Sequence, residues 1–143
     1  MAIWFRDDIS LDEINAMRSN TMLEVLGITF TAIGEDSLEG TMPVDDRTVQ
    51  PFRILHGGAN VALAETLGSL ASWLCLDPDR FYCVGVEINA NHLRAMREGM
   101  VTGVARPIHL GRSTHVWEVR IRDEQERPVC VSRMTMAVLE KRT

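Results

Sequence analysis

The sequence has 143 residues, of which 45% are hydrophobic and 24% charged, values typical of a single globular domain. Its formal net charge of -5 excludes recognition of nucleic acid through a strongly basic surface. No stretch approaches the roughly 18 consecutive apolar residues of a membrane span, and the acidic N-terminus lacks a signal-peptide pattern, so we expect a cytoplasmic protein without a membrane partner.

Two short helices are predicted near the N-terminus. Ser10 and Glu13 have the spacing of a capping box, in which Ser10 caps the helix and Glu13 reaches back to it. This helix is expected to run to about Asn20. A second helical turn over residues 22–26 is expected to stop at Gly27, because glycine favours the conformation that ends a helix.

A β-hairpin and a long connection are predicted next. Residues 28–33 and 37–44 alternate in strand fashion around a Gly-Glu-Asp turn, which indicates two paired strands. Residues 45–58 carry Pro51 and two glycines, and this composition is typical of a loop.

One long helix is predicted over residues 59–76. Its leucines recur at the 3.6-residue period of a helix face directed toward a core, at Leu63, Leu67, Leu70 and Leu74. Four strand-like segments follow, near residues 81–93, 99–108, 113–122 and 128–139. In the third of them apolar and polar residues alternate, which predicts a buried face made of His115, Trp117, Val119 and Ile121.

These elements predict an α+β fold over residues 1–143. Strands joined by turns as short as Gly111-Arg112 must be largely antiparallel. An antiparallel sheet wrapped around one central helix buries the apolar faces of both. The cysteines Cys75, Cys83 and Cys130 have no CxxC spacing and lie in apolar surroundings, so we expect free thiols.

Glu65 is the clearest anomaly of the long helix. It is the only charged residue between Gly57 and Leu76. At 100° per residue it lies opposite the leucines, on a face whose other members are small or apolar, namely Val61, Gly68, Ser69 and Ser72. We expect a partner subunit or a ligand to cover this face. Glu65 then either points to solvent, joins a structural hydrogen-bond network, or is a working carboxylate, because burial of an idle carboxylate is unfavourable.

The start of this helix is suited to binding a carbonyl oxygen. His56-Gly57-Gly58 enters the helix without bulky side chains at its two glycines, so backbone N–H groups are open there. The helix dipole adds a favourable positive potential. The N–H of Gly57 is therefore a sensible donor to a developing oxyanion, and Glu65 is a sensible nucleophile or general base.

Gly57 and Glu65 are too far apart to act on one carbonyl within one chain. Eight residues of helix separate them, which is about 12 Å along the axis. Two subunits that packed their helices side by side in antiparallel fashion would bring one subunit's Gly57 to the other's Glu65. The sequence thus predicts a composite site in a symmetric dimer.

The residues singled out so far belong to a larger pattern. Its parts are Met42-Pro43-Val44-Asp45, Gln50-Pro51-Phe52, Leu55-His56-Gly57-Gly58-Ala59, Ala64-Glu65-Thr66-Leu67-Gly68-Ser69, Val84-Gly85-Val86-Glu87-Ile88-Asn89-Ala90-Asn91-His92 and Ile108-His109-Leu110-Gly111-Arg112. In this order and spacing they resemble the bacterial hotdog-fold thioesterases, specifically dihydroxynaphthoyl-CoA thioesterases and the proofreading thioesterases of enterobactin synthesis, within the phenylacetic acid degradation (PaaI-like) superfamily. The resemblance extends from Trp4 to Leu139.

The resemblance implies a role for each matching residue. Glu65 would be the nucleophile or general base, and Gly57 would donate its N–H to the thioester oxygen. Gln50 and His56 would orient the thioester, and Ser69 would place the water or the acyl group. The pantetheine and nucleotide end of the substrate would lie near His92, Arg94, Gly111 and Arg112. Family members assemble as homotetramers, dimers of hotdog dimers. The substrate would be acyl-CoA, such as hydroxybenzoyl- or dihydroxynaphthoyl-CoA, or an acyl or aryl group on a carrier protein, and no further cofactor is expected.

Two positions depart from the family pattern. Arg53 stands where the family has a glycine, and if that glycine has a positive φ the arginine is strained by a kcal/mol or more. Its charge near the acyl pocket would alter the substrate range. Asn60 stands where serine is common.

Two other functions remain open from the residues. A hotdog dehydratase of β-hydroxyacyl thioesters also pairs a loop histidine with a helix carboxylate, whereas a non-catalytic module would bind acyl-CoA or an acyl carrier without cleaving it. The adjacency of His56 and Gly57 favours hydrolysis over dehydration, and retention of both Gln50 and Glu65 disfavours a mere binding module. The four histidines lack the spacing of metal ligands, so no metal site is expected.

Overall fold

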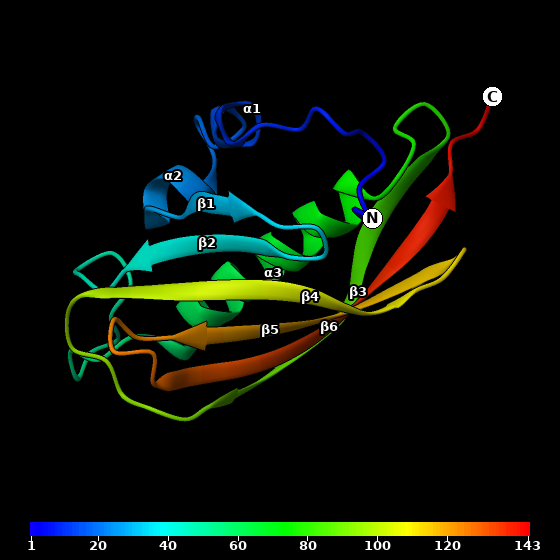
Figure 1. Cartoon of the computed structure of the whole chain (residues 1–143). Coiled ribbons are helices and arrows are strands. Elements are labelled where there is room, and N and C mark those ends of the chain that lie inside the picture. The colour runs from blue at the N-terminus through cyan, green and yellow to red at the C-terminus, as the bar shows by residue number, and fades with distance from the viewer.

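The computed structural model describes residues 1–143 as one sheet wrapped around one long helix (Figure 1). The elements are α1 (Leu11–Ala16), α2 (Met22–Leu26), β1 (Thr29–Ile33), β2 (Leu38–Pro43), α3 (Gly57–Leu74), β3 (Phe81–His92), β4 (Met100–Leu110), β5 (Thr114–Arg122) and β6 (Pro128–Glu140). All neighbouring strands are antiparallel, and their order across the sheet is β1-β2-β4-β5-β6-β3. The predicted α+β hotdog architecture is confirmed. None of the helices combines the length and apolarity that a membrane span requires.

The N-terminal helices lie beside β1, above the sheet in Figure 1. Ser10 caps α1 by accepting the N–H of Glu13 at 3.1 Å, as predicted. The predicted return contact is absent, because the carboxylate of Glu13 pairs with Arg6 at 2.7 Å instead. The helix also ends at Ala16 rather than at Asn20, which has a φ of 59° and turns the chain away from the helical path. Gly27, with a φ of 73°, ends α2 as predicted.

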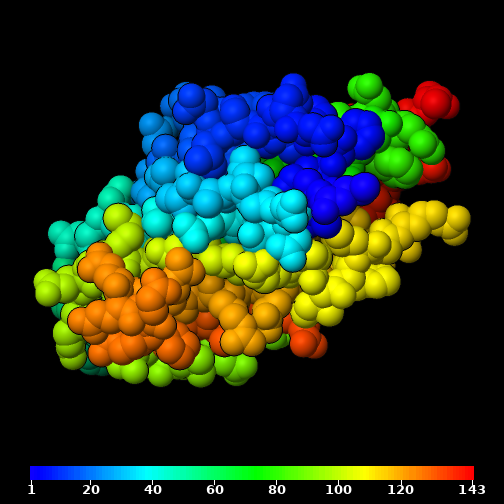
Figure 2. All heavy atoms as spheres, viewed as in Figure 1, coloured from blue at the N-terminus to red at the C-terminus, as the bar shows by residue number.

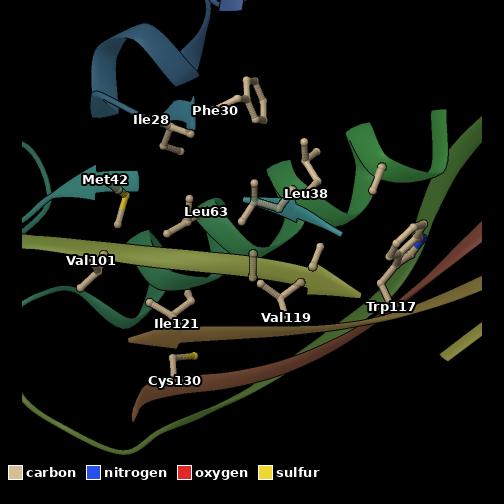
Figure 3. Packing of buried hydrophobic residues seen from close by; sticks show 14 of the residues in the cluster. Ile28, Phe30, Leu38, Met42, Leu63, Val101, Trp117, Val119, Ile121 and Cys130 are labelled. Atoms are coloured by element: carbon tan, nitrogen blue, oxygen red, sulfur yellow. The ribbon is translucent and has the colours of Figure 1, made fainter. Parts of the chain in front are cut away.

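The core lies between α3 and the concave face of the sheet. Figure 3 shows Leu63 of α3 among side chains of β2, β4 and β5. The approach is close because two strands carry glycines under the helix: a Cβ at Gly40 or Gly103 would lie 3.0 or 2.8 Å from the methyl groups of Leu67. The predicted buried face of β5 is confirmed, since His115, Trp117, Val119 and Ile121 are all at most 4% exposed.

The expectation of an uncovered small-residue face on α3 is wrong for two residues. Gly68 packs on the sulfur of Met134, and Ser72 is fully buried, accepting the indole N–H of Trp117 at 2.6 Å. The sheet curves far enough around α3 that β2 to β6 all contact it, so the chain's own strands cover this side. Leu70, expected in the core, is only partly buried and faces a cavity instead.

Candidate functional site

The first turn of α3 leaves a backbone N–H without an acceptor. His56 caps the helix, and its Nδ1 accepts the N–H of Gly58 at 2.7 Å. An accepting Nδ1 places the proton of the neutral ring on Nε2, so the Nε2–H of His56 is left as a hydrogen-bond donor that the helix cap does not use. The N–H of Gly57 has no acceptor within the chain. With the positive end of the helix dipole, this turn provides hydrogen-bond donors for a carbonyl oxygen.

His92, the last residue of β3, lies against this turn. A Cβ at position 57 would be 2.9 Å from its Nε2, so only glycine leaves room for the imidazole. The Nδ1 of the same ring is 3.4 Å from the side-chain nitrogen of Asn60, one turn further along α3. His92, assigned to the pantetheine end by resemblance, thus lies beside Gly57, the residue predicted to donate to the oxyanion.

The loop before α3 brings Gln50 to the same end of the helix. The N–H of His56 donates to the backbone oxygen of Thr48 at 2.8 Å, which fixes the loop against the start of the helix. The side-chain oxygen of Gln50 accepts the N–H of Phe52, and this bond leaves the side-chain N–H groups of Gln50 free to donate. Arg53 has a φ of 65°, which meets the condition under which strain is expected there, and its guanidinium pairs with Asp46.

Glu65 occupies the middle of α3, away from the first turn. Its side chain is partly buried, and its carboxylate makes no hydrogen bond or ion pair within the chain. One carboxylate oxygen rests against β3, 3.0 Å from the position that a Cβ of Gly85 would take. Within the chain, therefore, no structural hydrogen-bond network holds the carboxylate of Glu65. An unpaired, half-buried carboxylate beside a cavity is a candidate reactive group.

An apolar cavity of about 530 Å³ opens beside Glu65. Its far wall comes from the N-terminal helices and β1, with Met17, Met22 and Phe30 among the lining residues. Near the carboxylate it is lined by Thr66 and Ser69, and the only bond of the Ser69 hydroxyl is a weak one to the sulfur of Met136 at 3.7 Å. This volume and apolar lining suit the acyl part of a small ligand.

Cys83 also lines the cavity, but its thiol is not a nucleophile at neutral pH. Burial raises the pKa of Cys83. Burial, followed by the nearby Cys83, raises the pKa of Cys75 to about 12. All three cysteines are free, as predicted. Because the thiolate is the nucleophilic form of cysteine, the raised pKa values leave Glu65 as the candidate reactive group of the cavity.

The predicted site residues form two groups within one chain. His56, Gly57 and His92 meet at the start of α3, with Gln50 in the loop before it, whereas Glu65 and Ser69 lie two turns away at the cavity. Arg94 and Arg112 are exposed on loops, and the turn that holds Gly111 and Arg112 projects from the body of the molecule (Figure 2). The structure places Arg53 in the Gln50 loop.

Sequence reasoning missed the residues that shape the cavity. Gly85 was seen only as part of a family motif, and the methionines of the N-terminal helices carried no recognisable pattern. Their contribution depends on how α1 and α2 lie over α3, which local periodicity does not encode. The sequence marks Asn60 only as a departure from the serine common at this position.

Comparisons with known proteins match nearly the whole chain. The profile of the thioesterase superfamily matches residues 52–130. The 1,4-dihydroxy-2-naphthoyl-CoA hydrolase of Escherichia coli is 53% identical over 137 residues, covering 96% of this chain and 99% of the relative. The proofreading thioesterase EntH of Cronobacter sakazakii is also 53% identical, over 96% of this chain and 98% of its own length. A crystal structure of a mutant thioesterase from Pseudomonas aeruginosa superimposes with a TM-score of 0.95 at 51% identity, covering 98% of this chain and all of that one.

Proposed function

The chain belongs to the thioesterase superfamily and is a thioester hydrolase, and on this premise we propose that it cleaves aryl-CoA to the free acid and CoA at a site shared by two subunits. Two features of α3 carry the proposal. The N–H of Gly57 has no acceptor at the start of the helix, and the carboxylate of Glu65, two turns further on, has no partner and borders an apolar cavity. Each half of this machinery is incomplete without the other.

The carbonyl oxygen of the thioester binds at the start of α3. The N–H of Gly57 donates to it, and the free amide N–H of Gln50 and the Nε2–H of His56 orient it. Negative charge that builds on this oxygen during attack is stabilised by these fixed donors and by the helix dipole. Because Nδ1 of His56 is occupied by the cap, the ring is a donor and not the proton-exchanging base that a dehydratase requires.

Glu65 of the second subunit supplies the attack. Its carboxylate either adds to the carbonyl carbon, forming an anhydride and expelling CoA thiolate, or removes a proton from a water that adds there. Single turnover in ¹⁸O-water detects the anhydride route when the label appears in Glu65, whereas label in the acid alone shows only that water attacked the acyl carbon. Label enters the acid product directly if water attacks the acyl carbon, and enters Glu65 if water attacks the carboxyl carbon of an anhydride.

The acyl group occupies the cavity next to Glu65. Its volume of about 530 Å³ accommodates an aromatic ring system, and the hydroxyls of Thr66 and Ser69 are available to a ring hydroxyl near the thioester. The name of the Escherichia coli relative, a dihydroxynaphthoyl-CoA hydrolase, supports an aryl substrate. An aryl group on a carrier protein is the alternative form, supported by the proofreading relative.

The edge strand β3 is the surface on which we place the second subunit. It spans 12 residues, borders the sheet, and exposes apolar side chains, with Val86 64% and Val84 43% exposed. A long apolar edge strand left open is prone to pair with another chain. Pairing of two copies about a twofold axis supports the composite site, and a tetramer would be a dimer of such dimers.

The remaining predicted residues bind the CoA end. Arg94 and Arg112 are exposed cations suited to its phosphates, with Gly111 in the turn beside Arg112. Arg53 lies at the Gln50 loop, where its charge tunes the substrate range. The free thiols fit a reducing compartment, so a cytoplasmic location is part of the proposal.

A thiol-release assay with the Glu65→Gln variant tests the proposal. We expect the variant to lose at least about a hundredfold in kcat on aryl-CoA while binding substrate normally, because the amide is isosteric but neither basic nor nucleophilic. Glu124→Gln, the same change on an exposed carboxylate of the β5–β6 turn, is the control and should retain full activity. Parallel arms with fatty acyl-CoA and an aryl-carrier protein rank the substrates. Normal turnover by Glu65→Gln would remove the mechanism, and faster release from fatty acyl-CoA would remove the aryl assignment.

A further inference from the structure

We propose that Asn60 is a positioning residue that holds His92 in the tautomer with its proton on Nε2, so that His92 donates a second hydrogen bond to the thioester oxygen beside the N–H of Gly57. The inference rests on the proposed hydrolysis, because it assigns a role within that site. It moves His92 from the outer part of the substrate to the reacting carbonyl.

The contact between Asn60 and His92 has a defined direction. Asn60 is 3% exposed, its side-chain nitrogen is 3.4 Å from Nδ1 of His92, and its side-chain oxygen is buried without any partner. The reverse orientation of the amide would bury two N–H groups without an acceptor, and unpaired buried N–H groups are rarer than unpaired oxygens. The amide therefore donates, and Nδ1 accepts.

An accepting Nδ1 fixes the other nitrogen as a donor. In a neutral imidazole only one nitrogen carries a proton, so Nε2 of His92 is N–H. This nitrogen is 2.9 Å from the position that a Cβ of Gly57 would take, which places it beside the unpaired N–H of Gly57. Both donors thus border the same small volume at the positive end of α3.

His56 and His92 reach the same tautomer by different means. The backbone N–H of Gly58 fixes His56, whereas a side chain fixes His92. A substitution at Asn60 can therefore reverse the tautomer of His92 without touching the helix cap. This separates the role of His92 from that of His56.

The decisive variant is Asn60→Asp, compared with the wild type in both kcat and KM at the same pH. A carboxylate accepts but does not donate, so the proton of His92 moves to Nδ1 and Nε2 presents a lone pair to the carbonyl oxygen. We expect kcat to fall at least about tenfold while KM changes less than about threefold, since one oxyanion donor is removed. Asn91→Asp places the same charge one residue from His92 on the opposite face of β3, and it should change neither constant appreciably.

A double-variant cycle distinguishes positioning from a structural role. His92→Gln supplies a side-chain N–H that cannot tautomerise. In that background Asn60→Asp should reduce kcat less than about twofold, whereas an equal loss in both backgrounds would overturn the proposal. If Asn60→Asp does not fold, the kcat values of His92→Gln and His92→Ala test the proposal by themselves. His92→Gln should retain most of the wild-type kcat, and His92→Ala should lose most of it. Equal kcat values in the two variants would contradict a donor role for His92.

Imidazole ¹⁵N chemical shifts read the tautomer directly in the substrate-free protein. The wild type should show His92 protonated at Nε2, and Asn60→Asp should show it protonated at Nδ1. A wild-type His92 protonated at Nδ1 would refute the inference while leaving thioester hydrolysis intact. A wild type that releases no thiol would instead refute the proposed function, and the chemical shifts would still report on Asn60 and His92.

Discussion

Gly85→Ala perturbs the carboxylate of Glu65 without altering its chemistry. The new Cβ would lie 3.0 Å from a carboxylate oxygen of Glu65, whereas ordinary contacts begin near 3.4 Å, so the carboxylate must move by a few tenths of an ångström. A misplacement of about 1 Å costs about a hundredfold in rate, so a shift of about 0.4 Å corresponds to a loss of about sixfold in kcat. The backbone at Gly85 does not have a positive φ, and the end of the glutamate side chain gives way easily. The melting temperature should therefore not fall.

The assay is steady-state thiol release together with thermal unfolding. Gly40→Ala is the matched control, because its Cβ would meet a methyl of Leu67 and the backbone oxygen of Thr29, each at 3.0 Å. A backbone oxygen cannot give way, so Gly40→Ala should lower the melting temperature and leave kcat of the folded protein unchanged. Wild-type kcat in Gly85→Ala would refute the placement of Glu65 against β3 as the working geometry.

Three further predictions concern the buried network and the Gln50 loop. Ser72→Ala should lower the free energy of unfolding by about 2–4 kcal/mol in urea denaturation, because it removes the acceptor of the Trp117 N–H and the partner of His115, both buried; a loss below about 0.5 kcal/mol would contradict this. Burial, followed by nearby His109, lowers the pKa of His115 below 6.5, so near this pH the unfolded chain binds a proton that the folded chain does not. The free energy of unfolding should therefore fall as the pH drops below about 6.5, by up to about 1.4 kcal/mol per pH unit. His115→Asn should reduce this slope, and an equal slope in the variant would show that another group causes it. Arg53→Gly should raise the free energy of unfolding by about 1 kcal/mol, since glycine adopts a φ of 65° without strain. The same variant should change the order in which acyl-CoA substrates are preferred. An unchanged order would show that Arg53 does not determine specificity.

Local patterns predicted the elements of this fold closely. The alternation of residues 113–122 identified β5 and its buried face because strand burial repeats every second residue. Gly27 was identified as a helix end because its left-handed conformation is a local property. The helix period placed Glu65 opposite Leu63 and Leu67, and the structure keeps this relation.

What the sequence did not predict depends on tertiary curvature. The exposed face of α3 was judged from helix geometry alone, yet the sheet bends around the helix and buries Gly68 and Ser72. Leu70 was assigned to the core by the same reasoning, although the N-terminal helices leave a cavity beside it. The position of His92 against Gly57 also required the structure, because 35 residues and the end of a bent strand separate the two.

Subunit complementation tests the composite site most directly. Glu65→Gln leaves Gly57 intact, and Gly57→Val, whose side chain would collide with His92, leaves Glu65 intact, so each variant should be inactive alone. When equal amounts are unfolded and refolded together, half of the dimers are mixed, and each mixed dimer holds one intact site. If two subunits share each site, about a quarter of wild-type activity should therefore be recovered. Activity no greater than that of the separately refolded variants would show that Gly57 and Glu65 act within one chain and would contradict the account.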